Sequence, residues 1–178
     1  MAARQAAIKR GEVEDVLDPA FASKSDGSSD YVGATWVAYT AADGRGNYDQ
    51  AANYLEACLA KCSTVTPDFR EELILAAARF QATRRRNNDL AWQWFKSGNR
   101  EKSKMNRACT EALILYSEGK IDEALSKVRE GSNLVAQLPA GTMKNLQENA
   151  WMQLRQIIEK GSATSSAISD TLPADAQQ

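Results

Sequence analysis

The sequence contains no histidine among its 178 residues. This absence excludes a His-Glu-x-x-His zinc-peptidase helix, a Ser-His-Asp triad and a Cys-His pair, because each of them needs imidazole. The three cysteines, Cys58, Cys62 and Cys109, are too few for a structural zinc site, which usually has four ligands. We therefore expect no enzyme: no catalytic residue, no metal and no cofactor.

Proline and glycine are also scarce, with 4 and 10 residues. Most of them stand between segments of helical periodicity, and a chain that is 43% hydrophobic can bury a sizeable core. The net charge of −1 gives no overall field that would attract nucleic acid or an anionic membrane. No apolar run reaches the roughly 18–20 residues that span a bilayer, and the first residues lack the apolar centre of a signal peptide. We expect a cytoplasmic protein with no direct membrane insertion and no nucleic-acid partner.

Turn residues and apolar spacing predict one helical domain at 28–161. Residues 1–27 form a lead-in, and the small, polar residues 162–178 are expected to be a disordered tail. The seven predicted helices lie at about 29–43, 47–62, 66–86, 89–97, 100–118, 121–137 and 142–160.

The seventh helix presents an apolar face in the prediction and ends at a glycine, Gly161. Its apolar residues follow one another every three or four positions, which is helical spacing. They are Met143, Leu146, Ala150, Leu154 and Ile157.

One short pattern occurs three times: a turn residue, then an Asp in the first turn of a helix, then an Ala two positions later. The alanines are separated by 40 and 33 residues, a spacing typical of stacked helical hairpins. Glycine suits the left-handed residue of a tight turn, and alanine lets the second helix approach the first closely. The three copies are GNYDQA (46–51), RNNDLA (86–91) and GKIDEA (119–124).

GNYDQAANYLEACL and GKIDEALSKV resemble the second half of a tetratricopeptide repeat, in which a Gly-polar-aromatic-Asp-acid-Ala run opens the second helix. The RNNDLA copy lacks the glycine, and the first helices lack the full Trp-Leu-Gly-Tyr pattern of the family. The resemblance implies an all-α, tetratricopeptide-like array of about seven antiparallel helices, in three hairpins plus a capping helix. Such arrays act as scaffold or adaptor domains that bind a protein or peptide.

A second resemblance extends over residues 12–160. Four segments, in their order along the chain, are similar to the soluble C-terminal region of bacterial site-2-protease-like zinc metallopeptidases. They are SDGSSD, GRGNYDQA, LILAAARFQATRRRNNDLAWQWF and LYSEGKIDEALSKVREG. In those proteins the peptidase lies upstream in a membrane-embedded domain. The resemblance implies a soluble accessory or regulatory domain of such a peptidase and transfers no active site. It leaves open whether the chain is a fragment or a free-standing relative.

Aromatic anchors and arginines are the candidate partner-binding residues. Trp92 and Trp94 cannot share one helix face, so one of them is a candidate for exposure, while Tyr39 belongs to a first helix that would line a concave surface. The run Arg84-Arg85-Arg86 either complements the dipole of a helix end or contributes to a basic patch over 84–107 that suits an acidic peptide. The full set is Trp36, Tyr39, Arg79, Arg84, Trp92, Trp94 and Arg107.

Two further alternatives concern the same residue types. Cys58 and Cys62, one helical turn apart, either chelate a soft metal, respond to oxidants, or pack in the core, as buried free cysteines commonly do. The arginine run and the tryptophans would also suit single-stranded nucleic acid, in which case affinity would fall steeply with salt.

Overall fold

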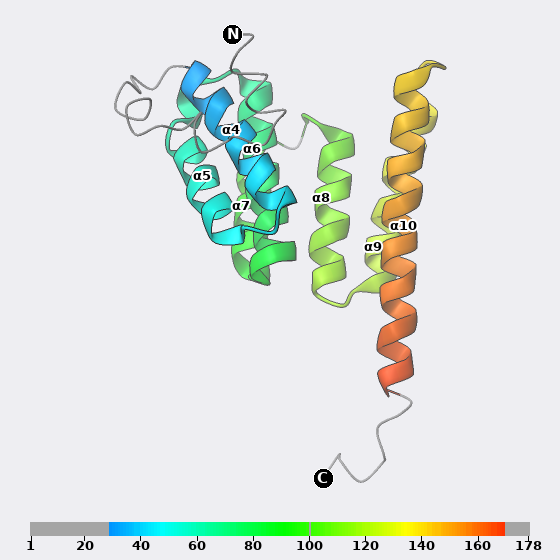
Figure 1. Cartoon of the computed structure of the whole chain (residues 1–178). Helices are drawn as coiled ribbons and strands as arrows, with labels where there is room; N and C mark the ends of the chain where they lie inside the picture. Colours follow the sequence, from blue (N-terminus) through cyan, green and yellow to red (C-terminus); the bar gives the residue numbers. More distant parts are fainter. Residues whose placement is uncertain (1–28, 100, 170–178) are drawn as a thin grey trace, which may run out of the picture. The chain divides into compact units, whose positions relative to one another are not determined.

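A computed structural model describes residues 29–99 and 101–169. In these residues the chain forms seven α-helices, one 3-10 turn and one π-helical turn, with no strand, so the fold is all-α as predicted (Figure 1). It divides into two compact units, and the boundary between Ala77 and Ala78 falls inside a helix. The sequence predicted one domain over 28–161. The predicted lead-in, 1–27, lies outside the described residues.

Unit 1 holds the hairpin of α4 (Ser29–Gly44) and α5 (Tyr48–Ala60), the 3-10 turn η1 (Cys62–Thr64) and most of α6 (Pro67–Phe80). Each of the three α-helices contributes one residue to a fully buried cluster. The ring of Trp36 packs beside it, 5.9 Å from the ring of Phe69 in an edge-on arrangement. The cluster consists of Val32, Cys58 and Leu73.

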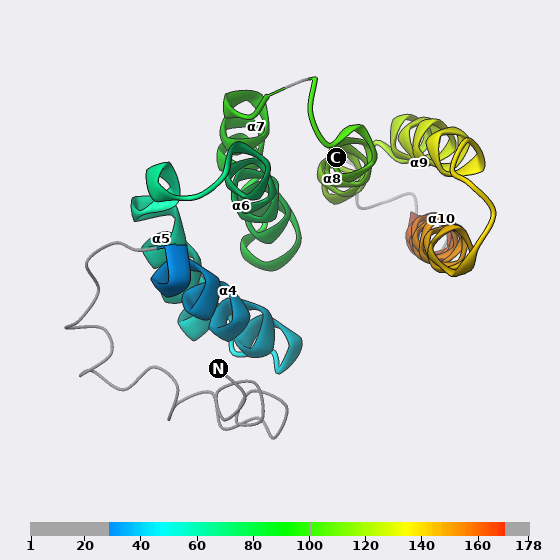
Figure 2. The same cartoon turned by 90° about the horizontal axis from the view of Figure 1, so that it is seen from above.

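Unit 2 begins with the end of α6 and continues through five elements, listed below. The helices α8 and α9 form a hairpin, and α10 packs on α9; Figure 2 shows the three side by side. Their shared core includes Val128, Trp151 and Ile158. The elements are the π-helical turn η2 (Gln81–Arg85), α7 (Asn88–Ser97), α8 (Lys104–Ser117), α9 (Ile121–Ala136) and α10 (Thr142–Ser169).

The two copies of the sequence pattern that contain glycine adopt the same local structure. Gly46 and Gly119 take the left-handed conformation, with φ of 77° and 78°. The next amide in each copy reaches back five residues, from Asn47 to the Ala42 carbonyl (3.0 Å) and from Lys120 to the Leu115 carbonyl (2.9 Å). This is the Schellman arrangement that ends a helix. In the copy without glycine, Arg86 itself is left-handed, with φ of 54°.

The alanine of each copy fills the position where the second helix meets its neighbours. Ala51, Ala91 and Ala124 are each 0% exposed. A larger apolar residue four positions later on the same face is buried as well. These three are Leu55, Phe95 and Val128.

Two predicted helix starts differ from the observed ones because side chains intervene. The fifth helix, expected from about 100, begins at Lys104. The Glu101 amide donates instead to the Asn99 side chain at 3.0 Å, and Ser103 is left-handed with φ of 51°. At the start of α5, Asn47 is the N-cap residue but its side chain donates to Gln50 rather than capping the helix.

The predicted apolar face of α10 is wrong in its orientation. Met143, Leu146 and Ile157 are 67%, 58% and 55% exposed, whereas Trp151 and Ile158 are 6% and 0% exposed. Trp151 determines the rotation because its indole covers the site of the missing side chain at Gly131, where a Cβ atom would lie 2.0 Å from the ring.

The end of α10 also differs from the prediction. Gly161 does not terminate the helix, which continues to Ser169. Its missing side chain leaves room for Tyr116, whose hydroxyl would lie 2.0 Å from a Cβ atom at that position. Residues 162–169 of the predicted disordered tail are therefore helical, and residues 170–178 lie outside the described residues.

Gly131→Ala tests the contact between α9 and α10. The added methyl group overlaps the buried Trp151 ring, so we expect the free energy of unfolding to fall by roughly 1–3 kcal/mol. Gly33→Ala is the matched control, because this helical glycine has nothing within 4 Å of the added atom. It should raise stability by about 0.5–1 kcal/mol. Urea denaturation measures both changes, and equal effects of the two substitutions would contradict the packing described.

Arg86→Gly tests the left-handed residue of the second copy. A side chain in this conformation costs about 1–2 kcal/mol, and glycine avoids that cost while adding freedom to the unfolded chain. We expect a net stabilisation of about 0.5–1 kcal/mol in thermal and urea unfolding. Gly46→Ala, with φ of 77° and open space around it, should be destabilising for the same reason. Destabilisation by Arg86→Gly would show that the Arg86 side chain matters more than its backbone.

Candidate functional site

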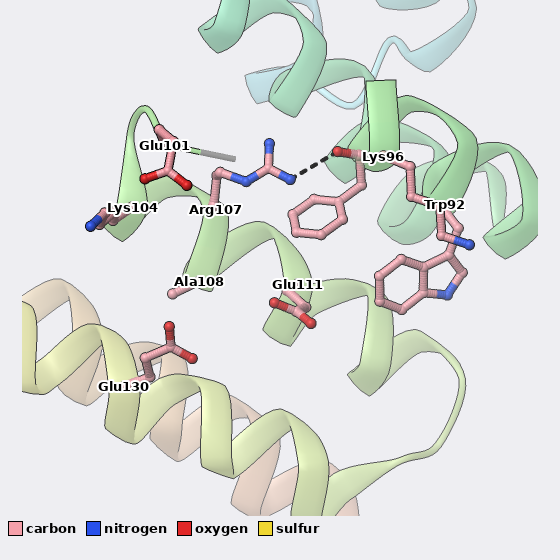
Figure 3. A pocket seen from close by; sticks show the side chains of 9 residues that line it. Trp92, Lys96, Glu101, Lys104, Arg107, Ala108, Glu111 and Glu130 are labelled. Carbon is pink, nitrogen blue, oxygen red and sulfur yellow. Dashed lines mark hydrogen bonds between the residues drawn. The ribbon is translucent and has the colours of Figure 1, made fainter. Parts of the chain in front are cut away.

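A cleft of about 580 Å³ lies in unit 2 between α7, the start of α8 and α9. Figure 3 shows Trp92 at one end, Lys104 and Glu101 at the other, and Glu130 approaching from α9. The lining combines an aromatic wall with charges of both signs. It consists of Trp92, Phe95, Lys96, Glu101, Lys104, Arg107, Ala108, Glu111 and Glu130.

Arg107 joins the two helices that form the walls of the cleft. Its guanidinium carbon lies 4.3 Å from the centre of the Phe95 ring, and Nη2 donates to the Phe95 carbonyl at 3.0 Å (Figure 3). That carbonyl is in the last turn of α7, where a cation complements the helix dipole. Arg107 is only 8% exposed, so this charge is largely desolvated and fixed in position.

Trp92 is fixed in a similar way. Its ring meets Phe95 edge-on at 5.5 Å, and its indole N–H donates to Glu118 Oε1 at 2.7 Å. The other oxygen of Glu118 lies 2.9 Å from Lys120 Nζ. Burial disfavours the carboxylate, but the hydrogen bonds from Lys120 and Trp92 and the charge of Lys120 outweigh it and lower the pKa of Glu118. Half-buried Trp92 thus presents one rigid face to the cleft.

Two acidic residues of the lining are held by one lysine outside it. Lys127 lies 3.1 Å from both Glu111 and Glu130. Partial burial opposes its charge, but the hydrogen bonds and the attraction to both glutamates raise the pKa of Lys127. The lining itself carries three cationic and three acidic side chains, so the addition of Lys127 makes the cleft and its border net positive by one charge.

The single basic patch predicted over 84–107 is in fact two clusters. Arg84, Arg85 and Arg86 lie exposed before the start of α7, where Arg85 stands 5.9 Å from the Phe80 ring. Lys96 is in the last turn of α7, with Nζ 5.9 Å from the Trp92 ring. Since α7 has 10 residues, the clusters are separated by about 15 Å along its axis.

The remaining predicted residues contribute to packing. Tyr39 is 8% exposed and lies 5.1 Å from half-buried Trp36, so both belong to the interior of unit 1 rather than to a concave surface. Arg79 donates from Nη1 to the fully buried Thr110 at 3.2 Å. Trp94 is half-buried and does not line the cleft. Of the seven predicted residues, the structure brings Trp92 and Arg107 together in it.

The acidic part of the lining was not predicted from the sequence: Glu101, Glu111 and Glu130. Lys96 and Lys104 were not distinguished from the arginine run either. One signal was available: Glu111 lies four residues after Arg107, so both point from one face of α8. Glu130 comes from a different helix, and spacing along the chain could not place it.

Cys58 belongs to the core and not to a metal site. It is 0% exposed, and burial raises the pKa of its thiol to about 12, which keeps it protonated and unreactive at neutral pH. In the described part of the chain, no group of three or more cysteines and carboxylates has the arrangement of a metal site. Nor does any helix described there combine the length and apolar character that a membrane span requires.

The pair of Trp92 and Glu118 should respond to acid. Because the folded pKa of Glu118 lies below the ordinary value of 4.5, ionisation stabilises the fold above pH 4.5, and this contribution is lost as pH falls through the lowered pKa. We expect the indole N–H resonance of Trp92 to shift with a midpoint below 4.5, followed by NMR and assigned with Trp92→Phe. Glu118→Gln should abolish the shift, and a midpoint at or above 4.5 would contradict the geometry.

Comparison of the chain with protein-family models, with curated proteins and with solved structures gave no match. The two family resemblances therefore stay predictions from the motifs.

Proposed function

We propose that this chain is a non-catalytic, tetratricopeptide-like helical-repeat domain that binds a protein partner through an acidic peptide segment. The observation that carries the proposal is the cleft beside α7, where an aromatic wall and cations surround about 580 Å³. Protein-binding hot spots are enriched in tryptophan and arginine that are held rigidly in partly desolvated sites. Trp92 and Arg107 have these properties.

The cleft offers two kinds of contact to a peptide. An apolar or aromatic side chain would pack on the face of Trp92, whose edge is held by Glu118. Acidic side chains would interact with Lys96 near Trp92 and with Lys104 at the other end. Because the indole and the guanidinium are already held by neighbours, little side-chain entropy is lost on binding.

Charge favours an acidic ligand over a basic one and over nucleic acid. Lys127 pairs with two of the three glutamates in the lining, and the cleft with its border is then net positive by one charge. The arginine run, which a nucleic-acid backbone would also need, lies about 15 Å away at the other end of α7. The ligand is therefore expected to be a short peptide segment rather than a strand that follows both clusters.

Charge reversal of the two lysines tests the proposal. The probe is a fluorescein-labelled library of about 12-residue peptides with one aromatic and several acidic residues; at about 3.3 Å per residue these span the whole cleft. We expect Lys96→Glu with Lys104→Glu to weaken binding at least about tenfold, measured by fluorescence anisotropy. The matched control, Arg84→Glu with Arg85→Glu, makes the same charge change at the other end of α7. If both double variants lose the same affinity, the effect comes from net charge alone and the cleft is not the binding site.

A cross-linked pull-down from source-organism extract, with membrane and soluble fractions separated, distinguishes the two proposed settings. Recovery of soluble partners through a cleft-dependent contact supports a scaffold or adaptor domain. Recovery of a membrane zinc peptidase supports the alternative, an accessory domain of a site-2-protease-like metallopeptidase. Loss of the partner in the lysine double variant would connect either outcome to the cleft.

A further inference from the structure

The C-terminal helix α10 is apolar over a wider arc than α9 covers. Trp151 and Ile158 are buried against α9, and Leu154 is half-buried beside them. The adjacent face carries a second stripe that stays exposed. It consists of Met143 (67% exposed), Leu146 (58%), Ile157 (55%) and the exposed Ala150.

Charge on α10 marks a different side as the one adapted to water. At about 100° per residue, Glu148, Arg155 and Glu159 lie about 140–180° around the helix from Ala150. Arg155 and Glu159 pair with each other there, at 2.7 Å. From Thr142 to Ile157, the side that borders the exposed stripe away from α9 holds only uncharged polar residues: Thr142, Asn149, Gln153 and Gln156.

The exposed stripe has the spacing of a helix-pairing seam. In a heptad assignment the a positions are Met143, Ala150 and Ile157, and the d positions are Leu146 and Gln153. Gln153 is the polar residue among these five. The pattern is also symmetric about its small residue, because Met143 lies seven residues before Ala150 and Ile157 seven after it. Leu146 and Leu154 are likewise four residues before and after.

We propose that α10 is the interface of a homodimer, in which two copies pair antiparallel about a two-fold axis at Ala150. This axis sets Met143 of one copy opposite Ile157 of the other and Leu146 opposite Leu154. The small side chain of Ala150 lets the helices approach closely where they cross. An isologous contact needs a self-complementary patch of this kind. From Thr142 to Ile157 the flank away from α9 is uncharged, so this part of the contact brings no like charges together.

The size of the contact indicates its strength. A specific interface buries about 1,000 Å² or more in total, so the neutral flank must be included as well as the stripe. A helix pair of this length is at the small end of that range, and we expect a dissociation constant on the order of micromolar. This inference does not depend on the proposed peptide cleft, which has other lining residues.

Sedimentation equilibrium of the full chain over a range up to about 100 µM tests the dimer. We expect reversible dimers, and Ala150→Glu should weaken them at least about tenfold by placing two carboxylates at the axis. Met152→Glu is the matched control, because Met152 is an exposed apolar residue (53%) about 200° around the same helix. Far-UV circular dichroism of both variants checks that they remain helical.

Cross-linking adds a geometric criterion. Under mild oxidation, Ala150→Cys should give a covalent dimer, because residues at a two-fold axis come within disulfide distance. Met152→Cys and the natural sequence, with its own three cysteines, should remain largely monomeric on a non-reducing gel. A chain that stays monomeric at about 100 µM, or that dimerises equally well with Ala150→Glu, overturns the proposal.

Discussion

Close helix packing at residues with almost no side chain is the constraint on which this structure depends. The alanine of each repeated pattern is fully buried, and Gly131 and Gly161 leave space for Trp151 and Tyr116. Protein interiors are dense, and a side chain at Gly131 or Gly161 would overlap the aromatic residue that fills the space. In unit 2 this packing fixes where α7 lies, and the position of α7 beside α8 sets the width of the cleft.

Arg107 connects that packing to the candidate site. Its guanidinium stacks on the Phe95 ring and donates a hydrogen bond to the Phe95 carbonyl at the end of α7, so one buried cation holds both walls. Burial of a charge costs free energy unless the charge is paired. The shape of the cleft therefore depends on the contact between Arg107 and Phe95. The cations that remain more accessible, Lys96 and Lys104, are then the ones available for a ligand's own charge.

Local patterns in the sequence were sufficient for the all-α class, for most helix bounds and for the left-handed turn residues. These features depend on interactions within a few residues. The orientation of α10 was not predictable in that way, because two apolar stripes lie side by side and the choice depends on the hole at Gly131, a residue of another helix. The burial of Tyr39 was not predictable for the same reason: it was chosen by residue type, and tertiary contacts bury it in unit 1.

The error in α10 itself carries information. The predicted apolar stripe of helical spacing was Met143, Leu146, Ala150, Leu154 and Ile157. Of these only Leu154 packs on the core, and the helix buries the neighbouring Trp151 and Ile158 instead. Exposed apolar side chains are common singly, whereas a seam that continues for four turns beside an uncharged flank is not. The apolar spacing indicates that this stripe is buried, whereas the single chain leaves it exposed. Both hold if a second molecule covers the stripe. The symmetry of the stripe about Ala150 makes a second copy the partner that fits it.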